Sequence, residues 1–98
     1  MGWGISMALN ETVYTDYKLG RWVNNNLADY HVPTNLDVGE MDAFWVEEED
    51  THINPIGAKG IGEIGITGAA AAIANAVFHA TGIRVRDLPI TPDKLLFS

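Results

Sequence analysis

The sequence predicts an α+β fold: a small antiparallel sheet packed with one main alanine-rich helix, in a single module that spans residues 1–98. Three observations favour this class. Short segments in the first half alternate apolar and polar residues, as half-buried strands do. The long segment 63–80 is rich in alanine and has helical periodicity. No repeat or linker divides the chain, and 98 residues suffice for one small domain.

The N-terminal part predicts a helix followed by a hairpin. Trp3 to Leu9 has apolar residues at spacings that permit a short helix of about two turns. Residues 11–16 alternate and indicate a strand, and residues 22–27 indicate the returning arm of a hairpin after a turn at 18–21. The chain opens directly in this apolar pattern, without a leader or a cap, so we expect it to be part of something longer.

The middle of the chain predicts one more strand and then an irregular loop. Residues 42–49 alternate Ala43, Trp45 and Glu47 against the intervening side chains, and the acids at the end suit an edge strand. Residues 54–62 have no regular period, and a proline and three glycines mark them as loop.

The C-terminal part predicts the main helix and a short second one. Glu63 to Ala80 is the strongest helical segment, and Gly82 is a suitable stop just after its last turn. Residues 83–86 are expected to be extended, and residues 91–94 resemble the start of a final short helix. The apolar stripe of the main helix is expected at Ile66, Ile73, Val77 and Ala80.

Charge and residue usage exclude several kinds of function. Six basic and thirteen acidic residues give a net charge of -7, which a nucleic-acid backbone would repel. The absence of cysteine excludes disulfides, a thiolate nucleophile and thiolate-held iron–sulfur clusters within this chain. His31, His52 and His79 lack metal-like spacing, and no apolar run suits a membrane span. We expect neither a nucleic-acid nor a membrane partner.

The loop Gly57–Gly65 is the segment best suited to chemistry. Its glycines let backbone N–H groups approach a ligand closely, and the following helix start favours an anion, with Lys59 as a nearby cation. Gly60, Gly62 and Gly65 also match the dinucleotide pattern G-x-G-x-x-G. No buried strand precedes them and too little chain follows for a doubly wound fold, so we treat that match as accidental.

Glu63 is the only acid between Asp50 and Asp87, and it lies among glycines, alanines and isoleucines. Burial would raise its pKa and a helix N-terminus would lower it, and a carboxylate between these influences can act as a general base. The structural alternative is that Glu63 only complements the charge of the helix start.

A resemblance favours the catalytic reading. The segments 57–63 and 68–77 resemble the C-terminal signature of molybdenum hydroxylase large subunits, the family of xanthine dehydrogenases and aldehyde oxidases. Segments 4–9, 26–34 and 84–94 agree with that family in the same order. The chain thus resembles the C-terminal part of a larger molybdopterin-binding domain along nearly all its length.

The resemblance implies an oxidoreductase that hydroxylates an aldehyde or an N-heteroaromatic, purine-like carbon with oxygen derived from water. It implies that Glu63 is the general base and that the backbone of Lys59, Gly60, Ile61 and Gly62 borders the molybdopterin; it assigns no metal ligand here. Iron–sulfur clusters and FAD are implied on partner subunits or domains, together with the remainder of the molybdenum subunit.

The family's other cofactor loops and substrate-orienting residues are absent from this chain. We therefore expect the isolated chain to be inactive and to expose apolar surface, with Trp3, Trp22 and Trp45 as candidates. From the residues alone, a stand-alone interaction module and an anion-binding module that uses Gly57–Gly65 remain alternatives. A cytoplasmic location is expected, with the periplasm as the alternative, and the sequence does not distinguish a purine from an aldehyde substrate.

Overall fold

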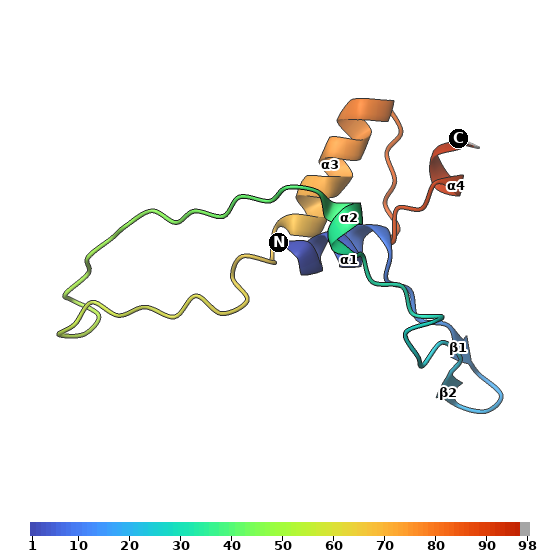
Figure 1. Ribbon diagram of the computed structural model, residues 1–98, viewed down its shortest axis with the longest axis horizontal. Coiled ribbons are helices and arrows are strands. Elements are labelled where there is room, and N and C mark those ends of the chain that lie inside the picture. Colours follow the sequence, from blue (N-terminus) through green and yellow to red (C-terminus); the bar gives the residue numbers. More distant parts are fainter. Residues whose placement is uncertain (97–98) are drawn as a thin grey trace.

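The computed structural model describes residues 1–96 and shows three parts that diverge from a small centre (Figure 1). These parts are a hairpin, a long open loop, and a helix followed by the C-terminal tail. The chain measures 54 × 38 × 25 Å, and its radius of gyration is 18.0 Å, against about 13 Å for a compact domain of this length. The elements are α1 (Gly2–Leu9), β1 (Thr15–Asp16), β2 (Arg21–Trp22), α2 (Asn35–Val38), α3 (Ala69–Thr81) and α4 (Asp93–Leu96).

The centre of the molecule is the contact between α1 and α3. On α1, Gly4, Ser6 and Ala8 are buried, and these small residues let the two helices approach closely. The C-terminal tail joins this centre through Ile90, whose backbone N–H donates to the carbonyl oxygen of Ala8 at 2.7 Å. The helix predicted at 3–9 is therefore confirmed, and it packs against the main helix.

The predicted hairpin is present, but its strands are shorter than expected. Only two residues of each arm pair, with Thr15 opposite Trp22 and Asp16 opposite Arg21. Beyond this pair one more backbone bond joins the arms, from the N–H of Val23 to the carbonyl of Tyr14 at 2.8 Å. The buried Asn24 side chain then continues the contact, because it donates to the carbonyl of Thr12 at 2.6 Å and accepts the N–H of Tyr14 at 2.9 Å. The α+β class is confirmed, with one two-stranded antiparallel sheet.

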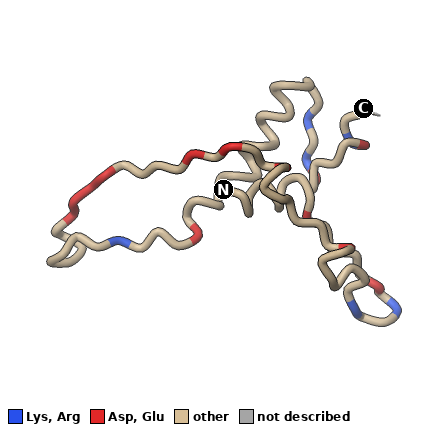
Figure 2. The backbone as a smooth tube through the Cα atoms, viewed as in Figure 1, with Lys and Arg blue, Asp and Glu red and all other residues tan. Residues whose placement is uncertain are grey.

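The strand predicted at 42–49 is wrong. These residues form one arm of the long loop between α2 and α3. They are exposed, and no strand of residues 1–96 lies beside them. An alternating pattern becomes a strand only where a neighbouring strand pairs its backbone groups. Figure 2 shows acidic residues along this arm of the loop.

The main helix is confirmed, but it begins at Ala69 instead of Glu63. Residues 62–68 form successive turns, because Gly65 and Gly68 disfavour the helix interior. The predicted stop is confirmed: Gly82 has φ 75° and its N–H donates to the carbonyl of Phe78 at 2.7 Å. Of the predicted stripe, Ile66, Ile73 and Val77 are half-buried and Ala80 is exposed.

The C-terminal tail returns along α3 and ends in the predicted short helix α4. Arg84 lies over the ring of Phe78, 3.8 Å from its centroid, and donates to Asn75 at 2.8 Å. The Lys94 ammonium donates to the carbonyls of Asp87 and Pro89, both at 2.8 Å.

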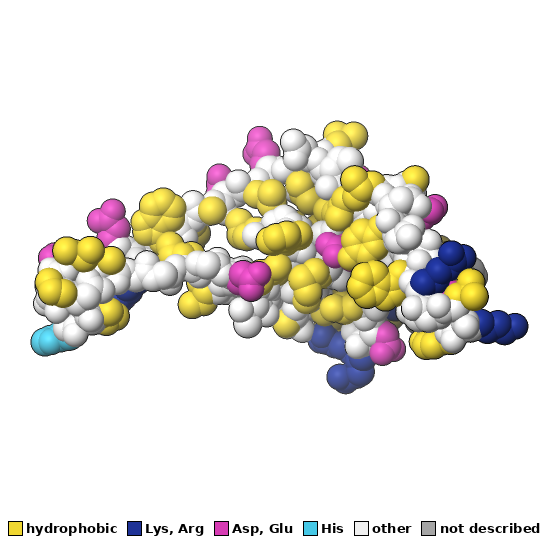
Figure 3. Space-filling view, turned by 90° about the horizontal axis from the view of Figure 1, so that it is seen from below, with side chains coloured by type: hydrophobic (Ala, Val, Ile, Leu, Met, Phe, Trp, Pro, Cys, Tyr) yellow, Lys and Arg dark blue, Asp and Glu magenta, His cyan; other side chains and the backbone are white. Residues whose placement is uncertain are grey.

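Little apolar surface is buried within the described residues, where Ala8 and Ile90 are the buried hydrophobic side chains. Trp3, Trp22 and Trp45 are 70%, 66% and 74% exposed, as the sequence predicts. Figure 3 shows hydrophobic side chains spread over one face of the molecule, from the long loop to the hairpin. In residues 1–96, no helix is long and apolar enough to cross a membrane.

Candidate active-site loop

The loop Gly57–Gly65 lies in the second arm of the long loop, which returns from the tip towards α1 and α3 (Figure 1). Gly57 and Gly62 have positive φ values of 64° and 45°, a region that L residues with side chains rarely adopt. A Cβ atom added at Gly60 would meet nothing within 4 Å. One face of this loop is therefore open backbone.

Glu63 is exposed and lies in a series of turns that leads into α3. The N–H of Ile64 donates to the carbonyl of Ile61 at 3.1 Å, and the N–H of Ile66 donates to the carbonyl of Glu63 at 3.0 Å. Because α3 begins only at Ala69, the predicted placement of Glu63 at the helix N-terminus is wrong. The position of Glu63 is fixed by turns, not by a helix start.

A shallow hollow of about 170 Å³ lies beside Glu63. Trp3 of α1 contributes one wall, and Ile66 contributes another. A carboxylate next to exposed apolar side chains suits a proton-transfer site, provided that a neighbouring surface closes the hollow and removes water. The remaining lining residues are Met1, Gly62 and Gly65.

The backbone of the loop fits an anionic cofactor. Within residues 1–96, the N–H groups of Lys59, Gly60, Ile61 and Gly62 donate no hydrogen bond. Successive free N–H groups form the kind of backbone surface that binds phosphate and other anions, and an added Cβ atom would meet nothing within 4 Å at Gly60 or Gly62. The predicted molybdopterin border at these four residues is therefore compatible with the donors that the loop presents.

Lys59 has a role that the sequence analysis missed. Its ammonium pairs with the Glu48 carboxylate of the opposite arm, with 2.7 Å between Nζ and Oε2. The Glu48 carboxylate thus neutralises the positive charge that was expected beside the loop. The backbone N–H groups are therefore the main hydrogen-bond donors that the loop presents to a ligand. Among the described residues, no group of three or more histidine, aspartate or glutamate side chains could hold a metal ion.

Asn54 is a second residue that the sequence analysis did not single out. Its side chain makes hydrogen bonds to Ile56 and to both the N–H and the carbonyl of Ala58. The signal was present in the sequence, because asparagine followed by proline commonly starts a turn closed by the asparagine side chain.

The chain is 48% identical over 96 residues to the molybdenum-binding subunit of an aldehyde oxidoreductase from Escherichia coli (strain K12). The match covers 98% of this chain. The chain belongs to the molybdenum hydroxylase family. No protein-family model matches it. A putative xanthine dehydrogenase molybdenum-binding subunit of the same organism is 42% identical over 97% of the chain.

A solved structure has a similar fold over a segment of its chain. The structure of quinoline 2-oxidoreductase from Pseudomonas putida 86 matches 95% of the chain with a TM-score of 0.74 and 33% identity. The chain spans only about one eighth of these proteins: 13% of the aldehyde oxidoreductase subunit, 12% of the xanthine dehydrogenase subunit and 12% of the solved structure. The predicted family is confirmed, and the roles of individual residues remain predictions.

Proposed function

We propose that this chain supplies the general base and part of the cofactor border of a molybdenum hydroxylase that acts on an aldehyde or an N-heteroaromatic, purine-like carbon. The observation that carries the proposal is the juxtaposition of Glu63 with the free N–H groups of residues 59–62. The family match supports it, because the relatives are named as molybdenum-binding subunits of aldehyde and xanthine enzymes.

The role proposed for Glu63 is to accept a proton from the water-derived nucleophile as that nucleophile attacks the substrate carbon. A carboxylate that is held by turns on both sides of its backbone is suited to this step, because a base must lie within hydrogen-bond reach of the proton it removes. The bound molybdenum cofactor would supply the two-electron oxidation of the substrate.

The role proposed for Lys59, Gly60, Ile61 and Gly62 is to hold the pterin part of the cofactor with backbone N–H groups. The absence of glycine side chains would let the cofactor approach the chain closely. Because the Lys59 ammonium already pairs with Glu48, the ammonium is assigned to holding the loop together and only its backbone to the cofactor.

The remaining parts of the enzyme lie outside this chain. The exposed apolar side chains suit contact with the remainder of the molybdenum subunit, and we propose that the chain is its C-terminal part and is inactive alone. Electrons would leave through iron–sulfur and FAD centres on partner subunits or domains. One matched relative is named as the gamma subunit of a dehydrogenase complex, which is consistent with a multi-subunit enzyme. The cytoplasmic location stays a prediction.

The deciding experiment replaces Glu63 with glutamine in the complete, cofactor-loaded subunit. Glutamine keeps the size of the side chain and cannot accept the proton, so we expect kcat with aldehyde and purine substrates to fall by about 10²–10⁴-fold. Molybdenum content should be unchanged. The matched control is Glu47→Gln, an exposed acid on the opposite arm of the loop, which should leave kcat unchanged. Retained turnover in Glu63→Gln would mean that Glu63 is only a structural residue of the turn.

A further inference from the structure

The tip of the long loop, residues 48–59, is tied together by one amide side chain. The Asn54 Nδ2 donates to the carbonyl of Ala58 at 2.7 Å, and its Oδ1 accepts the Ala58 N–H at 3.0 Å. The same Oδ1 accepts the N–H of Ile56 at 3.2 Å, and the Gly57 N–H donates to the Asn54 carbonyl at 3.1 Å. Asn54 therefore fixes the direction of the chain at Ala58, where it leaves the tip towards Glu63.

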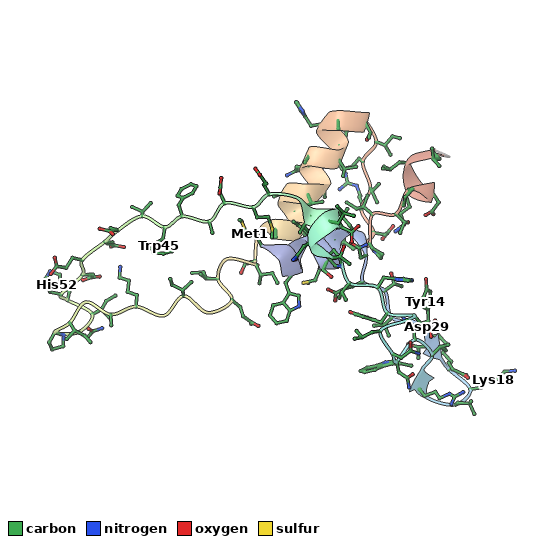
Figure 4. All side chains as sticks on the ribbon, in the orientation of Figure 1. Met1, Tyr14, Lys18, Asp29, Trp45 and His52 are labelled. Atoms are coloured by element: carbon green, nitrogen blue, oxygen red, sulfur yellow. The ribbon has the colours of Figure 1, made fainter. Side chains whose placement is uncertain are left out.

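A second tie joins the two arms immediately after this point. The Lys59–Glu48 ion pair connects the returning arm to the outgoing arm, and the two side chains are 34% and 65% exposed. A pair that water reaches this easily contributes little by itself, so Asn54 is the stronger of the two restraints. Figure 4 shows His52 at the far end of this tip and Trp45 along the outgoing arm.

The other end of the active-site loop is anchored independently. Hydrogen bonds from Ile64 to Ile61, from Ile66 to Glu63 and from Ala69 to Ile66 lead directly into α3. Only Lys59 and Gly60 lie between the residue held by Asn54 and the first residue of this series. Because the span is this short, we expect a change of direction at Ala58 to alter the path of the backbone that carries Glu63.

We propose that Asn54 is a positioning residue for the reaction, with Glu48 in a smaller supporting role. It touches neither substrate nor cofactor; it orients the backbone N–H groups of residues 59–62 and, through them, the Glu63 carboxylate. This proposal rests on the function proposed for Glu63. A misplacement of a reacting group by about 1 Å can cost about 100-fold in rate, so the restraint at the tip acts on kcat more than on substrate binding.

The test compares Asn54→Ala with His52→Ala in the complete, cofactor-loaded subunit. His52 lies in the same tip, and within the described part of the chain only its backbone N–H makes a contact, to Asp50. We expect Asn54→Ala to lower kcat by about 10–100-fold and to change KM by less than about threefold. Hydrogen exchange of residues 56–62 should become faster in Asn54→Ala, and His52→Ala should match the unchanged protein in all three measurements.

Two further variants make the result specific. Asn54→Asp keeps an oxygen that accepts the N–H groups of Ile56 and Ala58 but cannot donate to the Ala58 carbonyl, so its kcat and exchange rate should lie between those of the alanine variant and the unchanged protein. Glu48→Gln should give a smaller loss of kcat than Asn54→Ala, and Glu47→Gln should give none.

The outcomes separate this proposal from the one on which it rests. Retained turnover in Glu63→Gln overturns the base assignment. An inactive Glu63→Gln together with an Asn54→Ala that keeps its full kcat overturns the positioning role alone. If Asn54→Ala does not load the cofactor, hydrogen exchange of the cofactor-free subunit and the kcat of Asn54→Asp decide instead. Unchanged exchange at residues 56–62 also overturns the positioning role.

Discussion

Replacing Gly4 with alanine tests the contact between α1 and the start of α3, which supports the candidate active-site loop. A Cβ atom at Gly4 would lie 2.1 Å from the Cβ of Ala69 and 3.6 Å from the nearest side-chain carbon of Ile66. Carbon atoms pack at about 3.5–4.0 Å, so the new methyl group is about 1.5 Å too close to Ala69. Either α1 must move away from α3 or the start of α3 must shift.

The expected cost follows from two opposing effects. Alanine stabilises a helix by about 1 kcal/mol relative to glycine, whereas overpacking typically costs about 1–3 kcal/mol and occasionally more. An overlap of this size belongs at the upper end, so we expect a net loss of about 2 kcal/mol. The loss should also lower kcat, because Ile66 and Ala69 continue the turns that hold Glu63.

The assay is thermal unfolding of the complete subunit, with molybdenum content and kcat measured on the same samples. A protein of that size does not unfold in one step, so the variants are ranked by their midpoint temperature. Gly2→Ala is the matched control on the same helix, because its Cβ would lie 3.8 Å from Met41 Cε, an ordinary contact.

The double variant Gly4→Ala, Ala69→Gly completes the test. Removing the Ala69 methyl group leaves the new Cβ at 3.6 Å from the Ala69 Cα, so most of the lost stability and activity should return. The close-packing argument would be refuted if Gly4→Ala had the same midpoint temperature as Gly2→Ala. It would also be refuted if the double variant had a midpoint temperature no higher than that of Gly4→Ala.

Three further predictions concern local contacts. The Tyr30 hydroxyl donates to Glu11 at 2.5 Å, and this bond raises the pKa of Tyr30 above 10.0. The contact should persist below pH 10 and be lost as the pH rises through the raised pKa. The phenolate absorbance should therefore appear at a higher pH than for a free tyrosine, and Glu11→Gln should move it to a lower pH. Hydrogen bonds from the backbone N–H of Thr34, and then from its hydroxyl, lower the pKa of Asp37 below 3.8. The capping box of α2 should therefore be complete above pH 3.8 and be lost as the pH falls through the lowered pKa. The NMR signal of the Thr34 amide should report this change, and Asp37→Asn should remove its pH dependence. Gly82→Ala should destabilise the end of α3 by about 1 kcal/mol, because alanine disfavours φ 75°. The control Ala80→Gly, at an exposed helix position, should lose a comparable amount of stability without backbone strain at residue 82. Hydrogen exchange of the residue 82 N–H should therefore become faster only in Gly82→Ala.

Local signals predicted the parts of the fold that depend on few residues. The hairpin turn, the glycine stop at Gly82 and the helix α1 each follow from residues next to one another in the sequence. The stop and the helix are confirmed, and the turn predicted at 18–21 lies one residue earlier, at 17–20, because Arg21 belongs to β2. The prediction of a strand at 42–49 was wrong because an alternating segment needs a neighbouring strand, and the part of the chain that the structure describes places none beside it. The predicted start of α3 at Glu63 was wrong because Gly65 and Gly68 disfavour a helix interior more than the alanine-rich pattern favours one.

The candidate site likewise contains parts that the sequence predicted and parts that it did not. The glycine loop and Glu63 were visible as sequence motifs, but the contacts that hold them were not. Glu48 and Lys59 are separated in the sequence by the whole tip of the loop, and only the three-dimensional path of the chain brings their charges to 2.7 Å. Asn54 carries a turn signal in the Asn54-Pro55 pair, but that signal does not indicate which backbone groups its side chain binds.

The open shape of the long loop has a consequence for how such a subunit is made. Its outgoing arm, residues 40–49, makes no regular backbone pairing within the described chain. The exposed Lys59–Glu48 ion pair offsets little of the entropy lost when the arm becomes ordered. If the remainder of the subunit covers this arm, as proposed, the entropy of closing the loop is offset only when distant parts of the chain have already formed. The long loop, whose returning arm carries Glu63, would then be among the last segments to become ordered. Catalytic competence would therefore come only at the end of assembly.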